Sequence, residues 1–416
     1  MENQKYLNAN DSNPNKIGWM KGFPPEESKC ISANDGSFFE FPALRYSVNH
    51  IRELYPTRAV EAGAKKFKFK SKIDRQIESI TFVPWNEKQP VIWNDFLERN
   101  YTDGIIILHK GKIVYEKYPA GLKQNGVHSA MSVSKSFTGI LASILIDEGI
   151  INPEKLVTDY LPELQDSGFA GATVRNVLDM TTAIEYSEDY TNPNAEVWKF
   201  SASGNVYRPA DYSGPKNYYE YIKTVKKIPN QEHGQLFGYK TVNTELTAWI
   251  ISRVTGKSIT QLLSEKIWKP MGANYDGFYQ VGTAGIAFAG GGFSLNLRDM
   301  ALFGELLRNG GKQKGKQILT KKAVLEVSQG GSQDAFKNSG EYPLLQGWSY
   351  HNMWWITNNS HKAFMARGVH GQAIYIDPKA QMVIARFASN PLASNKYIDP
   401  ISIPTYEAIA DYLLKK

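Results

Sequence analysis

The sequence contains a single cysteine, Cys30, among 416 residues. One thiol cannot form an intrachain disulfide, so disulfide stapling is excluded and a reducing compartment fits this usage. The first residues contain no apolar core of signal-peptide length, and we expect a cytoplasmic protein. Nowhere do about 18 apolar residues follow one another, so we also expect no membrane span.

Motifs of several other enzyme classes are missing. The seven histidines show neither a His-Glu-x-x-His motif nor a paired ligand spacing, so we expect no metal site. Gly-x-Ser-x-Gly, which marks the nucleophile of α/β-hydrolases, is absent. The glycine run FAGGGFS at 288–294 lacks the flanking strand and helix of a dinucleotide-binding loop. We interpret it as close packing near a cleft.

The charge balance is mildly basic, with 48 lysine and arginine residues against 41 acidic ones and a formal net charge of +7. Only the run KKFKFKSK at 65–72 is strongly basic. One interpretation is that this run binds an anionic surface or polymer. A solvated strand edge with Phe67 and Phe69 on one face is the favoured interpretation, and we expect no nucleic-acid partner.

The chain is long enough for two lobes with large cores. Residues 1–85 have little periodicity and are interpreted as an N-terminal extension wrapped over the body, with a loose polar start of about 20 residues. A hairpin is predicted at 104–118 around the tight turn His109-Lys110-Gly111-Lys112. Further patterns predict strands at 348–357, 372–378 and 381–389, and helices at 243–256, 297–311 and 405–416.

Strands at both ends of the body with helices between them predict an α/β fold. We expect one antiparallel sheet flanked by helices, with a mainly helical lobe inserted. The sheet lobe is placed at 86–134 and 340–416, and the helical lobe at 135–339. The cleft would lie between the two lobes.

The stretch HSAMSVSKSFTGILASILIDEG, which begins at His128, places Ser132 and Lys135 at the start of an otherwise apolar helix. Residues i and i+3 share a helix face, so the two side chains can touch. A helix N-terminus suits a site where an oxyanion forms. Burial would lower the pKa of the lysine, and a neutral lysine can activate a serine hydroxyl. From the spacing alone, a capping serine with a lysine that reaches solvent fits equally well.

A second Ser-x-x-Lys pattern runs from Ser213 to Lys216. Gly214 and Pro215 lie inside it and disfavour a helix that would present both side chains together. We therefore do not expect a catalytic pair there.

Two features downstream carry chemistry. Tyr239 precedes a predicted helix, where a tyrosinate beside ammonium groups would act first as a general base and then as an acid. The segment from Gly368 to Gly371 begins a strand with glycines, which allow a ligand to approach the backbone. A strand-edge N–H there could complete an oxyanion hole.

The order Ser132-Val-Ser-Lys135, Tyr239 in FGYKTVN, and GVHGQ before an IYIDP strand resembles the serine β-lactamase and penicillin-binding superfamily. The resemblance is greatest to the 6-aminohexanoate-dimer hydrolase branch. The early GFPPEES and LRYSVNHIRELYPT also resemble that branch. The similarity therefore extends over nearly the whole chain from about Gly18.

The resemblance implies roles for individual residues. Ser132 would be the acylated nucleophile, Lys135 its proton partner, and Tyr239 the group that delivers a proton to the leaving group. The oxyanion hole would consist of the backbone N–H groups of Ser132 and Val369. Tyr190 matches a loop tyrosine that closes over substrate, with an ordinary loop aromatic as the alternative. The remaining positions expected at the substrate site are Asn243, Gly368 and His370, although His370, like His233, could equally be structural.

The chain departs from the superfamily pattern at two places. Ala366-Arg367-Gly368 stands where β-lactamases and transpeptidases have Lys-Thr-Gly or His-Thr-Gly, although Arg367 could substitute in holding a carboxylate. Tyr239-Lys240-Thr241 replaces the usual Tyr-x-Asn, with an asparagine only at Asn243. Both departures disfavour β-lactam turnover and leave acyl transfer untouched.

The sequence therefore predicts a cofactor-independent serine hydrolase acting on small linear amides or short-chain esters. An aromatic wall favours such substrates, and its expected members are Trp198, Trp348, Trp354 and Trp355. β-Lactamase or D-Ala peptidase activity is one alternative, and a non-catalytic binding protein on the same fold is another. The oligomeric state is left open, a homodimer included.

Overall fold

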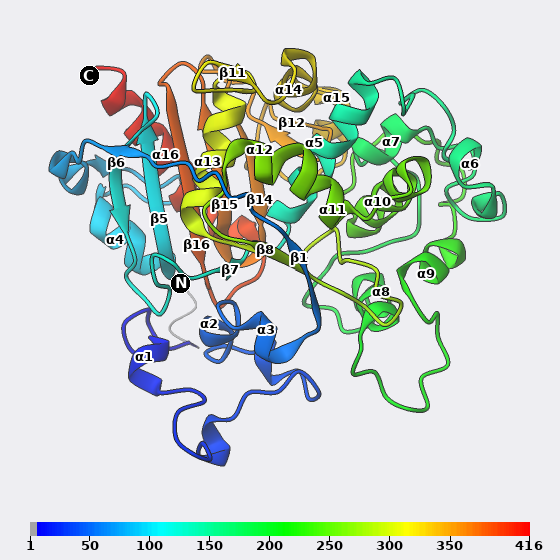
Figure 1. Cartoon of the computed structure of the whole chain (residues 1–416), viewed down its shortest axis with the longest axis horizontal. Helices are drawn as coiled ribbons and strands as arrows, with labels where there is room; N and C mark the ends of the chain where they lie inside the picture. The colour runs from blue at the N-terminus through cyan, green and yellow to red at the C-terminus, as the bar shows by residue number, and fades with distance from the viewer. Residues whose placement is uncertain (1–5) are drawn as a thin grey trace.

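The computed structural model describes residues 6–416, and its centre is an eight-stranded sheet (Figure 1). All its strand pairs are antiparallel except β2 with β6, which is parallel. The strands in spatial order are β12 (Ser349–His351), β13 (Trp354–Ile356), β14 (Phe364–Gly368), β15 (Gln372–Asp377), β16 (Met382–Ala388), β5 (Thr102–His109), β6 (Lys112–Lys117) and β2 (Lys70–Ser71). The predicted α/β fold with an antiparallel sheet is confirmed.

Helices cover both faces of this sheet. Helix α13 (Leu297–Arg308) packs against β5, β15 and β16, where its Gly304 lies directly on Val383. Helix α16 (Asp399–Leu413) lies on the opposite face, where Tyr406 contacts the Arg386 side chain. Side chains three residues apart on a strand point to opposite faces, which explains why Val383 and Arg386 meet different helices. Every residue of β5 is accordingly buried.

Local sequence signals account for the hairpin formed by β5 and β6. Its turn residues Lys110 and Gly111 have φ values of 50° and 73°. A two-residue turn with positive φ at both positions matches the twist of the flanking strands. The predicted hairpin is therefore confirmed.

A smaller sheet lies beside Ser132. Its strands are antiparallel in the order β1 (Thr57–Val60), β8 (Gly277–Gln280), β9 (Phe293–Leu295) and β7 (His128–Ser129). Strand β7 ends three residues before Ser132, so this sheet fixes the backbone that enters the turn carrying Ser132. Two further pairs are β3 (Thr81–Phe82) with β4 (Val91–Ile92) and β10 (Lys312–Gln313) with β11 (Lys316–Gln317).

Helices dominate the middle of the chain, as the sequence predicts. The central pair is α5 (Val133–Asp147) and α10 (Thr241–Thr255), which pack against each other. The others are α4 (Trp93–Arg99), α6 (Val157–Tyr160), α7 (Val174–Leu178), α8 (Glu196–Gly204), α9 (Tyr218–Thr224), α11 (Ile259–Leu263), α12 (Lys269–Met271), α14 (Lys321–Ser328) and α15 (Gln333–Asn338). Helix α13 lies within the range predicted as the helical lobe, yet it packs on the main sheet. Its apolar periodicity reveals a buried face but not the surface that buries it.

The N-terminal segment is folded from the first described residues onward. It contains α1 (Pro14–Ile17), α2 (Leu44–Ser47) and α3 (Ile51–Leu54) (Figure 1). The buried Arg45 guanidinium donates to Ser12 Oγ at 2.9 Å and to Asp103 Oδ1 at 3.1 Å. The prediction of a loose start is therefore wrong for residues 6–20, because a cation further along the chain binds this stretch. Residues 1–5 of that prediction lie outside the described part.

The basic run at 65–72 matches the strand-edge interpretation. Phe67 and Phe69 are partly buried, with ring centroids 5.0 Å apart, whereas the lysines around them are exposed. Within residues 6–416, no helix is long and apolar enough to cross a membrane.

The turn between β12 and β13 lies against helix α5. Asn352 and Met353 form it with φ values of 48° and 66°. A Cβ atom at Gly139 of α5 would lie only 2.2 Å from the Asn352 carbonyl oxygen, and Ser136 Oγ donates to the Met353 carbonyl at 2.8 Å. Only glycine at position 139 permits this approach.

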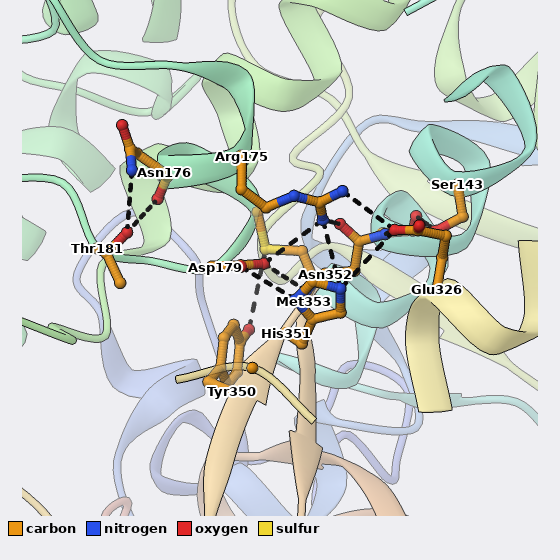
Figure 2. A network of polar contacts seen from close by, with 12 residues as sticks. Ser143, Arg175, Asn176, Asp179, Thr181, Glu326, Tyr350, His351, Asn352 and Met353 are labelled. Atoms are coloured by element: carbon orange, nitrogen blue, oxygen red, sulfur yellow. Dashed lines mark hydrogen bonds and ion pairs between the residues drawn. The ribbon is translucent and has the colours of Figure 1, made fainter. Parts of the chain in front are cut away.

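A polar network surrounds the same turn (Figure 2). Asn352 accepts a hydrogen bond from Arg175 at 2.9 Å and donates to Ser143 Oγ at 2.7 Å. His351 Nδ1 lies 3.0 Å from Asp179, and its other ring nitrogen lies 3.7 Å from Glu326. Burial opposes a charge on His351, but these two carboxylates outweigh it and raise its pKa to about 9. The network thereby connects α5, α7, α14 and the hairpin.

This network predicts a pH-dependent contribution to stability. A folded-state pKa above the unfolded value means that His351 stabilises fully below about pH 6.5 and loses its contribution as the pH rises through about 9. We expect His351→Asn to lower the free energy of unfolding by on the order of 2 kcal/mol at pH 6 and by much less at pH 9.5. Urea unfolding at both pH values measures this.

The control is His233→Asn, because burial lowers the pKa of His233. Its effect on the free energy of unfolding should not shrink between pH 7 and pH 9.5. An effect of His351→Asn that is the same at pH 6 and pH 9.5 would contradict the prediction.

Candidate active site

The turn that carries Ser132 is fixed by backbone contacts from two directions. Ser129 N–H donates to the Val48 carbonyl at 2.7 Å, and Ala130 N–H donates to the Phe293 carbonyl at 2.8 Å. Met131 then adopts a left-handed conformation with φ 46°, which is uncommon for residues other than glycine and typical of functional turns. Ser132 follows as the N-cap residue of α5.

Ser132 and Lys135 are in direct contact. Lys135 Nζ lies 2.9 Å from Ser132 Oγ and donates to the Gly290 carbonyl at 2.7 Å. The serine side chain makes no capping hydrogen bond to the helix, and Lys135 is 1% exposed. A capping serine with a solvent-reaching lysine is therefore excluded.

The environment of Lys135 favours its neutral form more than water does. Burial lowers its pKa to about 8, although the negative charges of Glu188 and Glu245 oppose this effect. A substantial fraction of the amine is thus unprotonated at mildly alkaline pH and able to accept the Ser132 proton.

Tyr239 stands directly before α10 and beside this pair. Its ring centroid lies 5.1 Å from Lys135 Nζ, and its ring packs against Trp355 at 5.4 Å. Burial, followed by the charge of Glu188, raises the pKa of Tyr239, and hydrogen bonding with Ser132 and the charge of Arg367 lower it less. The raised pKa favours a neutral Tyr239 phenol over the tyrosinate expected from the sequence.

Strand β14 approaches the nucleophile at its last residue, Gly368. A Cβ atom there would lie 2.8 Å from the Ala130 carbonyl oxygen and 3.0 Å from Ser132 N, so a side chain would displace the strand. This approach places Val369 beside Ser132, and both residues line one cavity. Within residues 6–416, neither of their backbone N–H groups donates a hydrogen bond. Both donors are free for an oxyanion.

The cavity beside Ser132 has a volume of about 560 Å³. Tyr190 lines it, and its hydroxyl donates to Glu188 at 3.3 Å. Of the four tryptophans expected in the wall, only Trp198 lines the cavity. Trp354 is completely buried in the core, and Trp348 and Trp355 pack against Arg367 instead. The glycine run at 288–294 contributes Gly290 and Gly291, in agreement with close packing near the cleft.

Two of the residues expected to bind substrate lie elsewhere. Asn243 is completely buried, and its side-chain amide donates to Thr182 Oγ1 at 3.0 Å. His370 is buried with its Nδ1 at 2.7 Å from the Asn390 carbonyl, and burial lowers its pKa to about 4. Neither residue lines the cavity. His233, which accepts a hydrogen bond from Ala183 N–H at 3.0 Å, is likewise part of the structure of its loop.

Arg367 is not available to hold a substrate carboxylate. Its Nη2 donates to both oxygens of Asp399, at 2.6 Å and 2.5 Å, and its guanidinium lies 4.4 Å from the Trp355 ring. The side chain is 4% exposed and does not line the cavity. This pairing disfavours Arg367 as a replacement for the missing Lys-Thr-Gly function.

Two acidic residues near Lys135, Glu188 and Glu245, were not predicted from the sequence. Glu245 is completely buried, and its Oε1 accepts the Gly290 N–H at 2.7 Å. Glu188, in the loop before α8, accepts a hydrogen bond from the Thr241 N–H. The sequence pattern could have identified Glu245, because it lies on the face of α10 shared with Val242, Leu246 and Trp249. A charge on an apolar helix face is the same anomaly that identifies Lys135. Glu188 has no such periodic signal.

Comparison with known proteins agrees with this geometry. The model of the beta-lactamase family matches residues 97–396. The 6-aminohexanoate-dimer hydrolase of Paenarthrobacter ureafaciens is 34% identical over 355 residues, which cover 85% of this chain and 88% of the relative. A Bacillus anthracis structure described as a 6-aminohexanoate-dimer hydrolase is 31% identical with a TM-score of 0.83, over 94% of this chain and 99% of that one.

More distant structures share the fold. A family VIII carboxylesterase has a TM-score of 0.54 at 18% identity, over 73% of this chain and 92% of that chain. One assignment accounts for all of these findings. It agrees with the Ser-x-x-Lys pair at the start of α5, with the sheet topology and with the two 6-aminohexanoate-dimer hydrolase matches. The chain belongs to the beta-lactamase family, close to the 6-aminohexanoate-dimer hydrolases, and is a hydrolase of the serine amidase or esterase type.

Proposed function

We propose that this hydrolase forms an acyl-enzyme on Ser132 and cleaves small linear amides or short-chain esters. The observation that carries the proposal is the 2.9 Å contact between Ser132 Oγ and the buried amine of Lys135. The P. ureafaciens relative named for the 6-aminohexanoate dimer supports a linear amide as one substrate class.

The first half-reaction follows from this geometry. Neutral Lys135 accepts the Ser132 proton while Oγ attacks the substrate carbonyl carbon. The N–H groups of Ser132 and Val369 donate to the oxygen that becomes negative. As the tetrahedral intermediate collapses, the Tyr239 phenol gives its proton to the leaving amine or alcohol and regains one from the Lys135 ammonium. The products are the ester of Ser132 and a neutral leaving group.

Water completes the cycle in the second half-reaction. A water molecule loses its proton to Lys135, directly or through Tyr239, and attacks the acyl carbon. Ser132 Oγ leaves and is reprotonated, so the acid is released and the site returns to its starting state. No cofactor takes part in either half-reaction as proposed.

The alternative activities are less well supported. β-Lactams and D-Ala peptides carry a carboxylate, and the expected partner for it, Arg367, is bound to Asp399. A non-catalytic binding protein is set aside by the assignment of the chain as a hydrolase. The amide and ester activities remain the favoured pair.

The nucleophile is tested with a fluorophosphonate and intact-mass measurement. We expect one covalent adduct that maps to Ser132, together with hydrolysis of p-nitrophenyl acetate and butyrate. Ser132→Ala should keep its fold by circular dichroism, lose the adduct and lower turnover by at least about ten-thousand-fold. The matched control is Ser213→Ala in the other Ser-x-x-Lys pattern, which should change neither result. Unchanged turnover of Ser132→Ala would refute the assignment.

The role of Lys135 as a base predicts a pH profile. Because the base must be neutral, kcat/KM should rise with pH through a midpoint near the Lys135 pKa of about 8. The negative charge of Glu245 raises that pKa, and because burial raises the pKa of Glu245 itself to about 8, this charge develops over the same pH range. Glu245→Gln keeps an oxygen for the Gly290 N–H and removes the charge, so the midpoint should move to lower pH.

The pH profile of kcat/KM for p-nitrophenyl butyrate measures this shift. The control is Glu116→Gln, which removes a carboxylate that is partly buried against Arg298, and it should leave the midpoint in place. A midpoint that moves to higher pH in Glu245→Gln would be inconsistent with the charge effect.

A further inference from the structure

The cavity beside Ser132 has one wall that lies outside the matched catalytic domain. The family model begins at residue 97, whereas residues 33–55 of the N-terminal segment form a large part of the lining. The apolar members of this wall are Phe38, Phe39, Leu44, Val48, Ile51 and Tyr55. The opposite wall comes from the catalytic domain and is aromatic as well, with Trp198, Phe200, Tyr218 and Phe288. A cavity of this size and composition suits an apolar group.

The N-terminal wall is fixed relative to the nucleophile. Arg45 of α2 forms a buried ion pair with Asp103 of β5 at 3.1 Å. Val48 accepts the Ser129 N–H at 2.7 Å, three residues before Ser132. Phe39 packs edge-on against His370 with centroids 5.2 Å apart, next to Val369. These contacts bind the segment to both sides of the oxyanion donors.

The cavity lining carries almost no charge. Among the described residues that line it, Glu40 is the only one with a charged side chain, and it is exposed. The nearby cations are engaged elsewhere, since Arg367 pairs with Asp399 and Lys240 Nζ donates to the Thr182 carbonyl at 2.8 Å. A carboxylate entering this cavity would lose its hydration without gaining a partner, which is unfavourable.

The position of Tyr239 decides which half of the substrate enters the cavity. Tyr239 is not among the described residues that line it, and in the proposed function this phenol gives its proton to the leaving group. The leaving group therefore departs on the Tyr239 side of Ser132. With the leaving group beside Tyr239, the cavity is available to the acyl group.

We propose that this cavity is a pocket for a neutral aliphatic acyl chain longer than acetyl, and that residues 33–55 determine the acyl specificity of the enzyme. The proposal rests on the proposed function, because it takes Ser132 as the acylated residue. It goes beyond that function by naming the acyl group and the segment that selects it.

Chain length and charge are tested with p-nitrophenyl esters. We expect kcat/KM to rise roughly tenfold for each two-carbon step from acetate to butyrate to hexanoate, since each added methylene is buried. The adipate monoester has the same six-carbon acyl length with a terminal carboxylate, and its kcat/KM should be at least about tenfold below that of hexanoate. A flat length series, or an adipate ester cleaved as well as hexanoate, would overturn the proposal.

A pair of isomeric esters tests the direction of binding. Ethyl hexanoate and hexyl acetate contain the same atoms, but the long chain lies on the acyl side in the first and on the leaving side in the second. We expect ethyl hexanoate to be cleaved with a kcat/KM roughly tenfold higher. A preference for hexyl acetate would place the chain on the other side of Ser132 and refute an acyl pocket.

Variants of the N-terminal wall test the role of the segment. Phe38→Ala should lower the ratio of kcat/KM for hexanoate to that for acetate by roughly tenfold. Phe23→Ala is the matched control, because Phe23 lies in the same segment but is fully exposed and outside the lining, and it should leave the ratio unchanged. Glu40→Lys, at an exposed position that does not threaten folding, should raise the ratio of adipate to hexanoate roughly tenfold. Unchanged ratios in both Phe38→Ala and Glu40→Lys would refute the role of residues 33–55.

The fluorophosphonate adduct separates the two possible failures. If Ser132 is labelled and esters are cleaved without the expected length and charge dependence, the acyl-pocket inference alone fails. If folded protein gives neither adduct nor turnover, the proposed function fails, and the inference fails with it.

Discussion

The site depends on one amine held almost entirely out of water. An isolated ammonium would be costly at the 1% exposure of Lys135, and the protein lowers that cost by providing oxygens rather than solvent. Ser132 Oγ and the Gly290 carbonyl lie within 3 Å of Nζ, and Glu245 binds the N–H of the same glycine. Burial nevertheless lowers the pKa of this amine to about 8, which makes the neutral form accessible for the proposed role as a base.

The second constraint is the close approach of separate backbone segments. Gly368 brings the end of β14 against the turn of Ser132, and Gly139 accepts the carbonyl of the β12–β13 turn on the other side of α5. Helix α5 is therefore fixed from the sheet at both its first and second turns. The network of Arg175, His351 and Asn352 strengthens the second contact (Figure 2). A helix start fixed in this way would hold Ser132 and the two proposed oxyanion donors in a constant arrangement.

The third motif of this chain differs from the Lys-Thr-Gly or His-Thr-Gly pattern, because Ala366-Arg367-Gly368 stands there. Arg367 pairs with Asp399 within the sheet lobe. The N-terminal segment supplies much of the lining of the cavity beside Ser132. In the proposed function, the reacting groups and the surface that selects the acyl chain therefore come from different parts of the chain, as is common where one fold supports several activities.

The sequence by itself determined the features that depend on local spacing. Short stretches of sequence were enough to predict four features. These are the i to i+3 contact of Ser132 and Lys135, the hairpin turn at Lys110 and Gly111, the order of the motifs, and the family. The tertiary structure alone decided the raised pKa of Tyr239, the enclosure of Asn243, the pairing of Arg367 and the choice of cavity aromatics. Periodicity shows which residues share a face, but the partner that packs on that face comes from distant segments. Burial and charge at a site are sums over those distant partners, and for that reason they could not be predicted from the sequence.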